Sequence, residues 1–502
     1  MKRVLSRRLV LSGLGAALAQ GLAPGIAGAG APAVSLRPRM RGPDFAARAA
    51  GGAEGLIARA GLSGTVACAV AHAGTGIRLE EVNGDMGLPP ASVAKALTAL
   101  YALDRLGPQH RFVTRLRALG PVENGILKGD LVLEGGADPE LDTDGLALLA
   151  GQLKSAGIRE VRGRFLVDDG ALPFLRSIDP LQPDHVGYSP AVSGIALNFN
   201  RVHFEWKRAG KGYAVSMDAR SAKYRPEVAI ARMQVAERRL PVYTYAEKSG
   251  VDHWSVARMA LGNGGARWLP VRNPALYAGD VFRTLARAGG LVLPAARQVR
   301  NAPPGGQVVA RLESAPLVEI LRGMLKYSTN LTAEMVGMAA TAAAGPAPAG
   351  LAQSARAMSE WAAARYGMTG TALVDHSGLG DASRMTPFDL VGALVQVHGD
   401  KRLRPLLKQF PMRDARGGID SAHPIRVDAK TGTLNFVSGL GGYMTAADGT
   451  VLAFAIFTAD GARRDRIPPE ARERPPGARE WNRQSRRLQQ ALIERWGALY
   501  GS

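Results

Sequence analysis

The pattern of apolar positions predicts a strongly buried helix early in the chain and a small antiparallel sheet near its end. Residues 93–103 are almost all apolar, with Lys95 as the only charge, which is typical of a helix in a protein core. Residues 427–434, 437–444 and 450–457 predict three successive strands, the last two joined by an Asp-Gly turn. The chain therefore mixes helices with an antiparallel sheet.

Further patterns favour an α/β, more narrowly α+β, architecture. Residues 142–156 predict an amphipathic helix, and residues 161–168 predict a strand soon after it. Residues 202–299 alternate apolar and polar side chains between frequent glycines, which predicts a β-rich segment. Residues 479–499 predict a final helix packed on a sheet. Its apolar stripe consists of Trp481, Leu488, Leu492, Trp496 and Leu499.

A first candidate for chemistry opens the buried helix. Ser92 follows Pro89-Pro90-Ala91, and Lys95 lies three residues later on the same helical face. Burial and the positive helix end both lower the pKa of such an amine, so it can act as a general base towards the serine hydroxyl. The backbone N–H of Ser92 can hold an oxyanion. Taken alone, this spacing is more often a capping serine beside a lysine that reaches solvent.

A second candidate lies at the entrance of another apolar run. Ser328 and Asn330 are two residues apart, directly before the helix-like segment 332–343. Short polar side chains at such a position usually satisfy backbone groups of the helix end, and this structural explanation is favoured when the pair is seen alone.

The third candidate is a polar string in the first of the three C-terminal strands. Lys430 and Gly432 alternate along the strand and share one face, whereas Thr431 and Thr433 point the other way. Gly432 lacks a Cβ and would let a substrate backbone lie close to the strand, and Lys430 offers positive charge to a carboxylate. Such a string in an ordinary edge strand is common and decides nothing alone.

The three strings together are informative. Ser-x-x-Lys, Ser-x-Asn and Lys-Thr-Gly occur in the order known for penicillin-recognising enzymes, each in its expected structural setting. The chain thus resembles the penicillin-binding protein superfamily, and more narrowly the serine-type D-alanyl-D-alanine carboxypeptidase/endopeptidase family, low-molecular-mass class C. This resemblance implies a transpeptidase/β-lactamase-like domain, an antiparallel sheet flanked by helices, with two smaller domains inserted between the first two motifs.

Segments outside the motifs carry the same resemblance over nearly all of the chain after its first residues. They are 112–116, 129–139, 191–200 and 375–379. Departures lie beside the motifs: His376 replaces a usual glycine, Thr329 a common Asn or Asp, and Asn435-Phe436 the usual small residues. A hydrogen-bonded loop histidine is the favoured interpretation of His376.

The resemblance also implies a role for each motif residue. Ser92 is the nucleophile, Lys95 its base, and Ser328 returns the proton to the leaving amine. Asn330 holds the acyl side, while Lys430, Thr431 and Thr433 bind the terminal carboxylate beside Gly432, with Thr431 ranked lowest because of its sheet direction. The implied partners are peptidoglycan stem peptides and β-lactams as covalent inhibitors, and no cofactor is implied.

Two other functions are alternatives for this set of motifs. A serine β-lactamase would share the motifs, but the comparable string 194–198 has Gly194 where a deacylating carboxylate belongs. A non-catalytic wall-binding protein would be expected to lose Ser92 or Lys95. Metal hydrolysis is disfavoured because the eight histidines show no metal-ligand spacing.

The spacing of the motifs predicts the domain organisation. Far more residues separate Lys95 from Ser328 than one helix-to-helix connection needs, so whole domains are inserted there. We expect an export signal at 1–29, the catalytic domain at 40–111 and 308–502, a β-rich insertion at 112–137 and 212–307, and a nested α/β domain at 138–211.

The basic, apolar start of the chain predicts export to a bacterial periplasm. Ser6-Arg7-Arg8 resembles a twin-arginine signal, with a Sec signal as the alternative, and Ala27-Gly28-Ala29 offers a cleavage site. The net charge is +20, but the charges are dispersed and export removes nucleic acids as partners, so we expect attraction to an anionic wall or membrane surface. The single Cys68 is expected to be buried and cannot form an internal disulfide.

Overall fold

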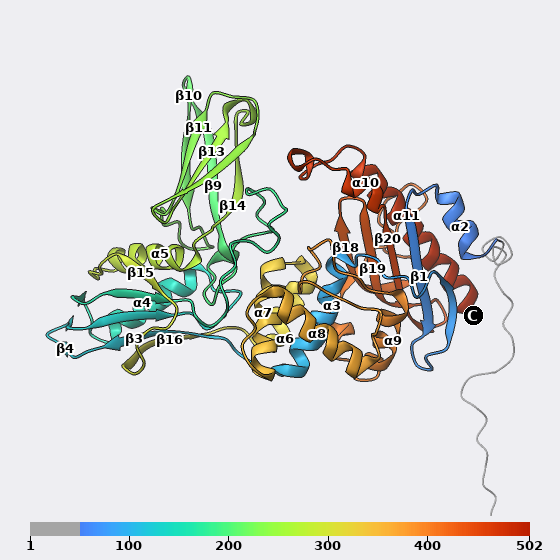
Figure 1. The fold of residues 1–502 in the computed structure, drawn as a ribbon, viewed down its shortest axis with the longest axis horizontal. Coiled ribbons are helices and arrows are strands. Elements are labelled where there is room, and N and C mark those ends of the chain that lie inside the picture. Colours follow the sequence, from blue (N-terminus) through green and yellow to red (C-terminus); the bar gives the residue numbers. More distant parts are fainter. Residues whose placement is uncertain (1–50, 502) are drawn as a thin grey trace, which may run out of the picture. The chain divides into compact units, whose positions relative to one another are not determined.

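The computed structural model describes residues 51–501, in which a six-stranded antiparallel sheet carries the third motif, while the first two motifs lie at the starts of helices (Figure 1). The strand order is β17-β18-β19-β20-β1-β2. These strands are β1 (Thr65–His72), β2 (Arg78–Val82), β17 (Lys408–Phe410), β18 (Arg426–Leu434), β19 (Val437–Thr445) and β20 (Val451–Ala459). The three predicted C-terminal strands are thus confirmed, and β1, from far earlier in the chain, pairs with β20.

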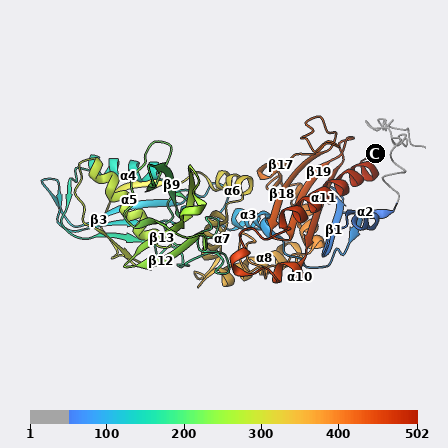
Figure 2. The same cartoon turned by 90° about the horizontal axis from the view of Figure 1, so that it is seen from above.

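Helices cover both faces of this sheet. They are α2 (Gly52–Ala60), α3 (Ala94–Arg105), α6 (Leu317–Tyr327), α7 (Asn330–Ala344), α8 (Leu351–Tyr366), α9 (Pro387–His398), α10 (Gly461–Asp465) and α11 (Ala478–Tyr500). Successive side chains of β1 point to opposite faces of the sheet, so they belong to two different hydrophobic cores. Val66, Cys68 and Val70 pack with α2 and α11, while Ala67 and Ala69 pack with α9 and the helices around α3 (Figure 2).

The insertion between the first two motifs begins with a mixed sheet in the order β15-β8-β6-β3-β16. Its strands are β3 (Val113–Leu119), β6 (Asp130–Glu134), β8 (Phe165–Asp168), β15 (Ala296–Val299) and β16 (Gln307–Glu313), packed with α4 (Thr143–Ser155) and α5 (Pro274–Ala288). A small sheet of β4 (Val122–Glu123), β5 (Ile126–Leu127) and β7 (Glu160–Val161) adjoins it in sequence. The helix predicted at 142–156 is confirmed. The single strand predicted at 161–168 is instead divided into the end of β7 and β8, which belong to different sheets.

Two three-stranded sheets form the β-rich part of the insertion, in the orders β10-β9-β14 and β11-β13-β12. Their strands are β9 (Arg201–Ala209), β10 (Gly212–Asp218), β11 (Ala231–Ala236), β12 (Tyr243–Lys248), β13 (Val251–Ala257) and β14 (Gly264–Pro270). The β-rich prediction for residues 202–299 is therefore confirmed as far as the end of β14. The helix α5, which follows β14, was not predicted.

The sheets divide the insertion at other residues than we predicted. The pieces 112–137 and 138–211 do not separate, because β6 and β8 pair in parallel and α4 supplies the crossover that a parallel pair requires. The nested unit is instead the β-rich part, β9 to β14. The second part of the catalytic domain also begins later than 308, because β16 pairs with β3 of the insertion.

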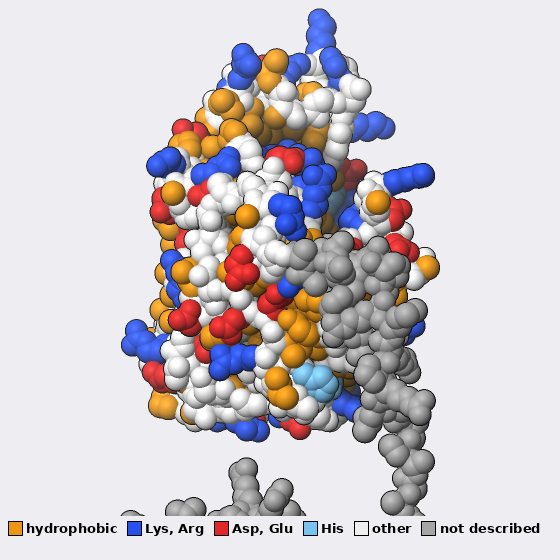
Figure 3. Space-filling view, turned by 90° about the vertical axis from the view of Figure 1, so that its right-hand side faces the viewer, with side chains coloured by type: hydrophobic (Ala, Val, Ile, Leu, Met, Phe, Trp, Pro, Cys, Tyr) orange, Lys and Arg blue, Asp and Glu red, His pale blue; other side chains and the backbone are white. Residues whose placement is uncertain are grey.

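Several expectations concern the surface and the first residues. The predicted export signal and residues 40–50 lie outside the described residues. Within 51–501, no helix combines the length and the apolar character needed to cross a bilayer. Lys and Arg lie among Asp and Glu side chains on the face drawn in Figure 3. Cys68 is fully buried, as predicted, and burial raises the pKa of its thiol to about 12.

We expect α11 to contribute strongly to stability through Trp496, which is fully buried against the sheet. Trp496→Ala should lower the free energy of unfolding by about 3–5 kcal/mol, because it leaves a cavity in a packed core. Arg479→Ala, an exposed position on the same helix, is the control and should change stability by no more than about 0.5 kcal/mol in denaturant titrations. Equal effects of the two substitutions would contradict this account of the core.

Candidate active site

Ser92 lies in a single 3₁₀ turn, Ala91–Val93, that leads directly into α3. The predicted helix is confirmed, and its start is shaped by Pro90, whose carbonyl accepts a hydrogen bond from the Val93 N–H. Ala91 has a φ of 46°, an uncommon conformation for a residue with a Cβ. The turn leaves Ser92 half-exposed at the helix entrance while its neighbours Ala91 and Val93 are fully buried.

Lys95 is completely buried, and its Nζ has three partners. It lies 2.9 Å from Ser92 Oγ, 2.7 Å from Asn330 Oδ1 and 2.8 Å from the Ser377 carbonyl oxygen. A neutral amine has two N–H groups for the two obligate acceptors and a lone pair that can accept the serine O–H. Burial lowers the pKa of Lys95, which favours this neutral form.

Two buried carboxylates near Lys95 oppose that effect. Glu334 on α7 and Asp375 in the loop after α8 raise the Lys95 pKa through their charge. Glu334 was missed by the sequence analysis, and Asp375 was found only as part of the segment 375–379, with no role. Glu334 accepts hydrogen bonds from the N–H groups of His376 and Ser377, and Asp375 from those of Gly378 and Gly380. The two acids thereby fix the loop whose carbonyl holds Lys95. A signal existed, because Glu334 is the only charged residue between Lys326 and Arg356.

Ser328 and Asn330 occupy the junction between α6 and α7. Ser328 ends α6 with a φ of 59°, and Asn330 is the first residue of α7. The Ser328 hydroxyl accepts a 3.0 Å hydrogen bond from Lys430 Nζ. Asn330 accepts from Lys95 and donates its amide, at 2.9 Å, to the carbonyl oxygen of Tyr188 in the insertion. The second motif therefore lies between the two lysines of the other motifs, with Asn330 hydrogen-bonded to Lys95 and Ser328 to Lys430.

The third motif lies on β18 next to the nucleophile. Lys430 and Gly432 are buried, whereas Thr431 and Thr433 are exposed, which agrees with the predicted alternation. Gly432, however, faces the protein's own backbone: a Cβ there would lie 2.9 Å from the Ser92 nitrogen. The glycine thus lets the strand approach the Ser92 turn closely. Thr431 and Lys430 also line one cavity, and the low rank given to Thr431 stays a prediction.

Gly378 makes a second close approach to the Ser92 turn. Its φ is 74°, and a Cβ would lie 1.8 Å from the carbonyl oxygen of Ala91. The loop held by Glu334 and Asp375 can therefore pack directly beneath Ser92 only with glycine at this position. The turn that carries Ser92 is clamped between this loop and β18.

These residues open onto a cavity of about 560 Å³. Its lining includes Ser92, Ser328, Asn330 and Thr433 from all three motifs. Leu181, Gln182 and Tyr188 of the insertion also line it. A further set of charged residues lies around the same cavity, namely Asp381, Arg464, Asp465, Arg472 and Glu473. Lys95 and Lys430 are hydrogen-bonded to Ser92 and Ser328 of this lining, so the three motifs are brought to one place.

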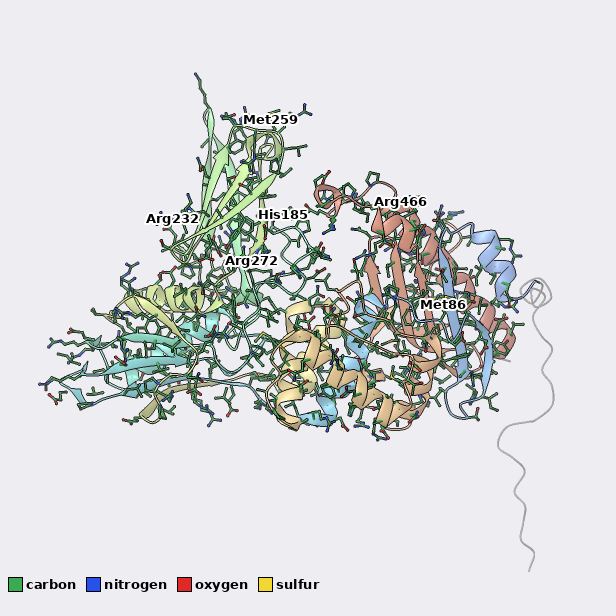
Figure 4. The ribbon with its side chains drawn as sticks, in the orientation of Figure 1. Met86, His185, Arg232, Met259, Arg272 and Arg466 are labelled. Atoms are coloured by element: carbon green, nitrogen blue, oxygen red, sulfur yellow. The ribbon has the colours of Figure 1, made fainter. Side chains whose placement is uncertain are left out.

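The insertion is tied to the wall of this cavity. His185 is labelled in Figure 4. Its Nε2 lies 2.6 Å from Glu473, and Arg267 of β14 lies 3.0 Å from the other oxygen of the same carboxylate. The hydrogen bond from His185 and the charge of Arg267 lower the pKa of Glu473 to about 2. Arg472 donates to the carbonyl oxygen of Leu181. The loop that supplies Tyr188 is therefore anchored to the segment between α10 and α11.

His376 lies beneath the site rather than in it. The side chain is fully buried, its Nε2 lies 2.7 Å from Ser354 Oγ, and burial lowers its pKa to about 3. The expected hydrogen-bonded loop histidine is confirmed.

One group of side chains has metal-ligand character. His203, Glu205 and Asp218 hold their ligand atoms within 4.8 Å of one another on β9 and β10. The Arg220 guanidinium lies 2.5 Å from Glu205 and 2.8 Å from Asp218, so an arginine already neutralises both carboxylates. None of the three lines the cavity at Ser92.

Comparison with known proteins decides the family. The model of the D-Ala-D-Ala carboxypeptidase 3 (S13) family matches residues 54–474. The chain belongs to this family. A D-alanyl-D-alanine carboxypeptidase of Actinomadura sp. (strain R39) is 28% identical, over 77% of this chain and 76% of that protein. The DacB carboxypeptidase of Haemophilus influenzae is 25% identical, over 76% of this chain and 82% of that protein. This S13 carboxypeptidase is therefore a hydrolase.

The fold agrees with that assignment. The crystal structure of penicillin-binding protein 4 (DacB) from Haemophilus influenzae matches with a TM-score of 0.67 at 22% identity, and covers 81% of this chain and 93% of its own. A second structure of that protein, complexed with a β-lactam, matches with a TM-score of 0.64. The predicted transpeptidase-like fold is confirmed.

The protonation of Lys430 predicts how the rate of acylation depends on pH. Burial lowers the pKa of Lys430 to about 7, and the charges of Lys95 and Lys408 contribute to the lowering. Its ammonium form therefore dominates below that pH and is lost as the pH rises through it. Lys408→Gln removes one repelling charge, so the alkaline limb of acylation by a carboxylate-bearing β-lactam should move to higher pH. Stopped-flow measurement of the acylation rate across the pH range gives the position of the alkaline limb for the wild type and for Lys408→Gln.

The control for that experiment is Lys401→Gln, an exposed lysine in the turn before β17. It should leave the alkaline limb in place. An unchanged limb in Lys408→Gln would show that Lys430 does not govern carboxylate binding.

Proposed function

We propose that this chain hydrolyses D-alanyl bonds of peptidoglycan stem peptides, as a D-Ala-D-Ala carboxypeptidase and D,D-endopeptidase, through an acyl-enzyme on Ser92. The observation that carries the proposal is the hydrogen bond between Ser92 and the buried amine of Lys95. An amine that lacks water around it and holds a serine hydroxyl is prepared to accept the serine proton.

The open edge of β18 supports the binding of an extended peptide. β17 pairs only with Val427 to Ala429, so in the described chain Lys430 to Leu434 have no strand partner on that edge. A peptide can add a strand there, held by main-chain hydrogen bonds. Its acyl part would lie towards Leu434 and Asn330, and its terminal carboxylate towards Lys430, Thr431 and Thr433. The amide of Asn330 would exchange the Tyr188 carbonyl for an oxygen of the substrate.

Acylation then follows from the geometry. Lys95 takes the proton of Ser92, Ser92 Oγ forms a bond to the D-alanyl carbonyl carbon, and the N–H groups of Ser92 and Thr433 stabilise the oxyanion. The C–N bond breaks, and the proton that Lys95 took from Ser92 returns through the Ser328 hydroxyl to the leaving amine, so that Lys95 is neutral again. Lys430 holds the Ser328 hydroxyl in position for that transfer.

Hydrolysis completes the cycle. Water, with Lys95 again as base, attacks the ester carbon, and the Ser92 hydroxyl is regenerated. A β-lactam is expected to acylate Ser92 and to leave slowly. Gly194, the residue in the place of a deacylating carboxylate, packs on the backbone of Asp169 and does not line the cavity. This favours a peptidase over a β-lactamase.

We also propose that the protein works outside the cytoplasm, in a periplasm. The support is the basic start of the chain with its Arg7-Arg8 pair and small-residue cleavage motif, together with a substrate found in the cell wall.

Replacement of the nucleophile tests this function. Ser92→Ala should abolish covalent labelling by a fluorescent penicillin and the release of D-alanine from stem pentapeptides, while Ser216→Ala, an exposed serine of β10, should retain both. In-gel fluorescence and a D-alanine assay measure the two outcomes. Labelling that persists in Ser92→Ala would place the acyl-enzyme on another residue.

A further inference from the structure

A cavity within the insertion has a lining that includes three arginines, Arg176, Arg272 and Arg300. It has a volume of about 490 Å³ and is formed by the loop after β8, by β12, by the segment between β14 and α5, and by the end of β15. Arg272, labelled in Figure 4, lies between β14 and α5. No residue of the described chain lines both this cavity and the one that contains Ser92. The cavity therefore gathers positive charge at a place that the proposed reaction does not use.

Arg272 carries a charge that is buried and incompletely neutralised. Its side chain belongs to a residue that is only 5% exposed, and burial lowers its pKa, but a guanidinium stays charged in proteins. The carboxylate that pairs with it belongs to the exposed Asp184, whose Oδ1 lies 3.7 Å from Arg272 Nη2. A buried charge normally has a close counter-ion, so this place can accept a further anion.

Two buried polar atoms beside this charge have no hydrogen-bond partner within residues 51–501. They are Arg272 Nε and Asn273 Oδ1. The other two nitrogens of the Arg272 guanidinium donate to the carbonyl oxygens of Arg176, Ser189 and Asp184. A buried N–H of a charged group without an acceptor is costly, so the unpaired Nε also indicates that an acceptor is missing here.

The other two arginines are exposed and are oriented by aromatic rings. The Arg176 guanidinium lies 5.0 Å from the centroid of the Tyr245 ring, and that of Arg300 lies 5.5 Å from the Phe174 ring. A guanidinium that stacks on a ring keeps its N–H edge available to an anion. Arg300 Nε lies 3.9 Å from the buried Asp169, which is beyond hydrogen-bond distance. The two side chains are therefore held at the cavity and can still donate to a ligand.

The charges of the lining indicate the class of ligand. Among the described residues that line the cavity, the three arginines are opposed by one acid, Glu247. The charge of Arg176 contributes to the lowering of the Arg272 pKa, so these two guanidiniums are close enough to repel each other. A phosphate group brings about two negative charges at pH 7 and three acceptor oxygens. A carboxylate brings one charge and two oxygens, so the lining matches a phosphate group better.

We propose that the cavity formed by Arg176, Arg272 and Arg300 is a binding site for a phosphate group, carried either by free phosphate or by a phosphate monoester. The planar guanidiniums supply the donors, and the ligand supplies the counter-charge that the buried Arg272 lacks.

The site shares a loop with the catalytic cavity. Arg272 holds the carbonyl oxygens of Asp184 and Ser189, and between these two residues Tyr188 accepts a hydrogen bond from Asn330. A ligand that neutralises Arg272 relieves a buried charge only while the loop keeps this conformation. Bound phosphate therefore stabilises the loop that lines the catalytic cavity.

Calorimetric titration of the full chain with inorganic phosphate tests the proposal. The wild type should bind phosphate, and should bind acetate at least about tenfold more weakly at the same ionic strength, because acetate satisfies fewer charges. Arg300→Gln should weaken phosphate binding by about tenfold through the loss of one charge-assisted contact. Arg297→Gln removes the same charge from an exposed position of β15 outside the lining and should leave the affinity unchanged.

A second variant and a second measurement locate the ligand. Arg176→Gln should weaken binding as Arg300→Gln does, and it leaves the contact between Arg300 and Asp169 intact. Hydrogen–deuterium exchange of the wild type should become slower in residues 176–190 and 296–300 when phosphate is added. Circular dichroism and fluorescent-penicillin labelling show that the fold and Ser92 are intact in each variant, independently of phosphate binding.

The remaining outcomes decide between ligands or overturn the proposal. Binding of glycerol 3-phosphate as tight as that of inorganic phosphate identifies a monoester as the ligand, whereas binding of inorganic phosphate alone identifies the free ion. Equal affinity for acetate and phosphate, equal effects of Arg300→Gln and Arg297→Gln, or no binding at all would refute a phosphate site. Slower exchange confined to another basic surface, such as that of Arg483, Arg486 and Arg487 on α11, would refute it as well.

Discussion

The buried amine of Lys95 is the constraint around which the site is organised. An ammonium or amine without access to water must find partners in the protein, since an unsatisfied polar group at that depth is costly. Here the partners come from three distant segments: Ser92 one turn earlier, Asn330 at the start of α7, and the carbonyl of Ser377. Satisfying one nitrogen therefore fixes the relative positions of α3, α7 and the loop after α8.

Two opposing effects set the protonation of that amine. Burial favours the neutral form, while Glu334 and Asp375 favour the charged form. The carboxylates are themselves held by backbone N–H groups of one loop, so they cannot move away to relieve the balance. A base that accepts and returns a proton in each cycle needs both forms within reach at working pH. The two acids give Lys95 that property, and also secure the loop that packs against the Ser92 turn through Gly378.

How much of this could be predicted depends on the range of the interactions. Ser92, Lys95, Ser328, Asn330 and the Lys430 strand were all found from local strings, because each string has its own helical or strand setting. Glu334 was missed and Asp375 was given no role, since their effect on Lys95 exists only after α7 and the loop that follows α8 pack together. The partition of the insertion failed for the same reason. Nothing local in β3 indicates that it pairs with β16, nearly two hundred residues away by sequence. The role of Gly432 was also misread, because its neighbour is the Ser92 turn and not a substrate.

The two sides of Ser92 differ in how they are built, and this bears on what the enzyme accepts. On the acyl side, the insertion contributes Leu181, Gln182 and Tyr188, and the His185–Glu473–Arg267 cluster holds that loop in place. The acyl pocket therefore forms only when the insertion and the catalytic domain are correctly positioned against each other. On the side of Lys430 and Thr431, the lining comes from α6, β17, β18, β19 and α11 with adjoining residues, and no residue of the insertion lines that cavity. The acyl part of the proposed substrate therefore meets a pocket built by two modules, whereas its terminal carboxylate meets residues of one module only.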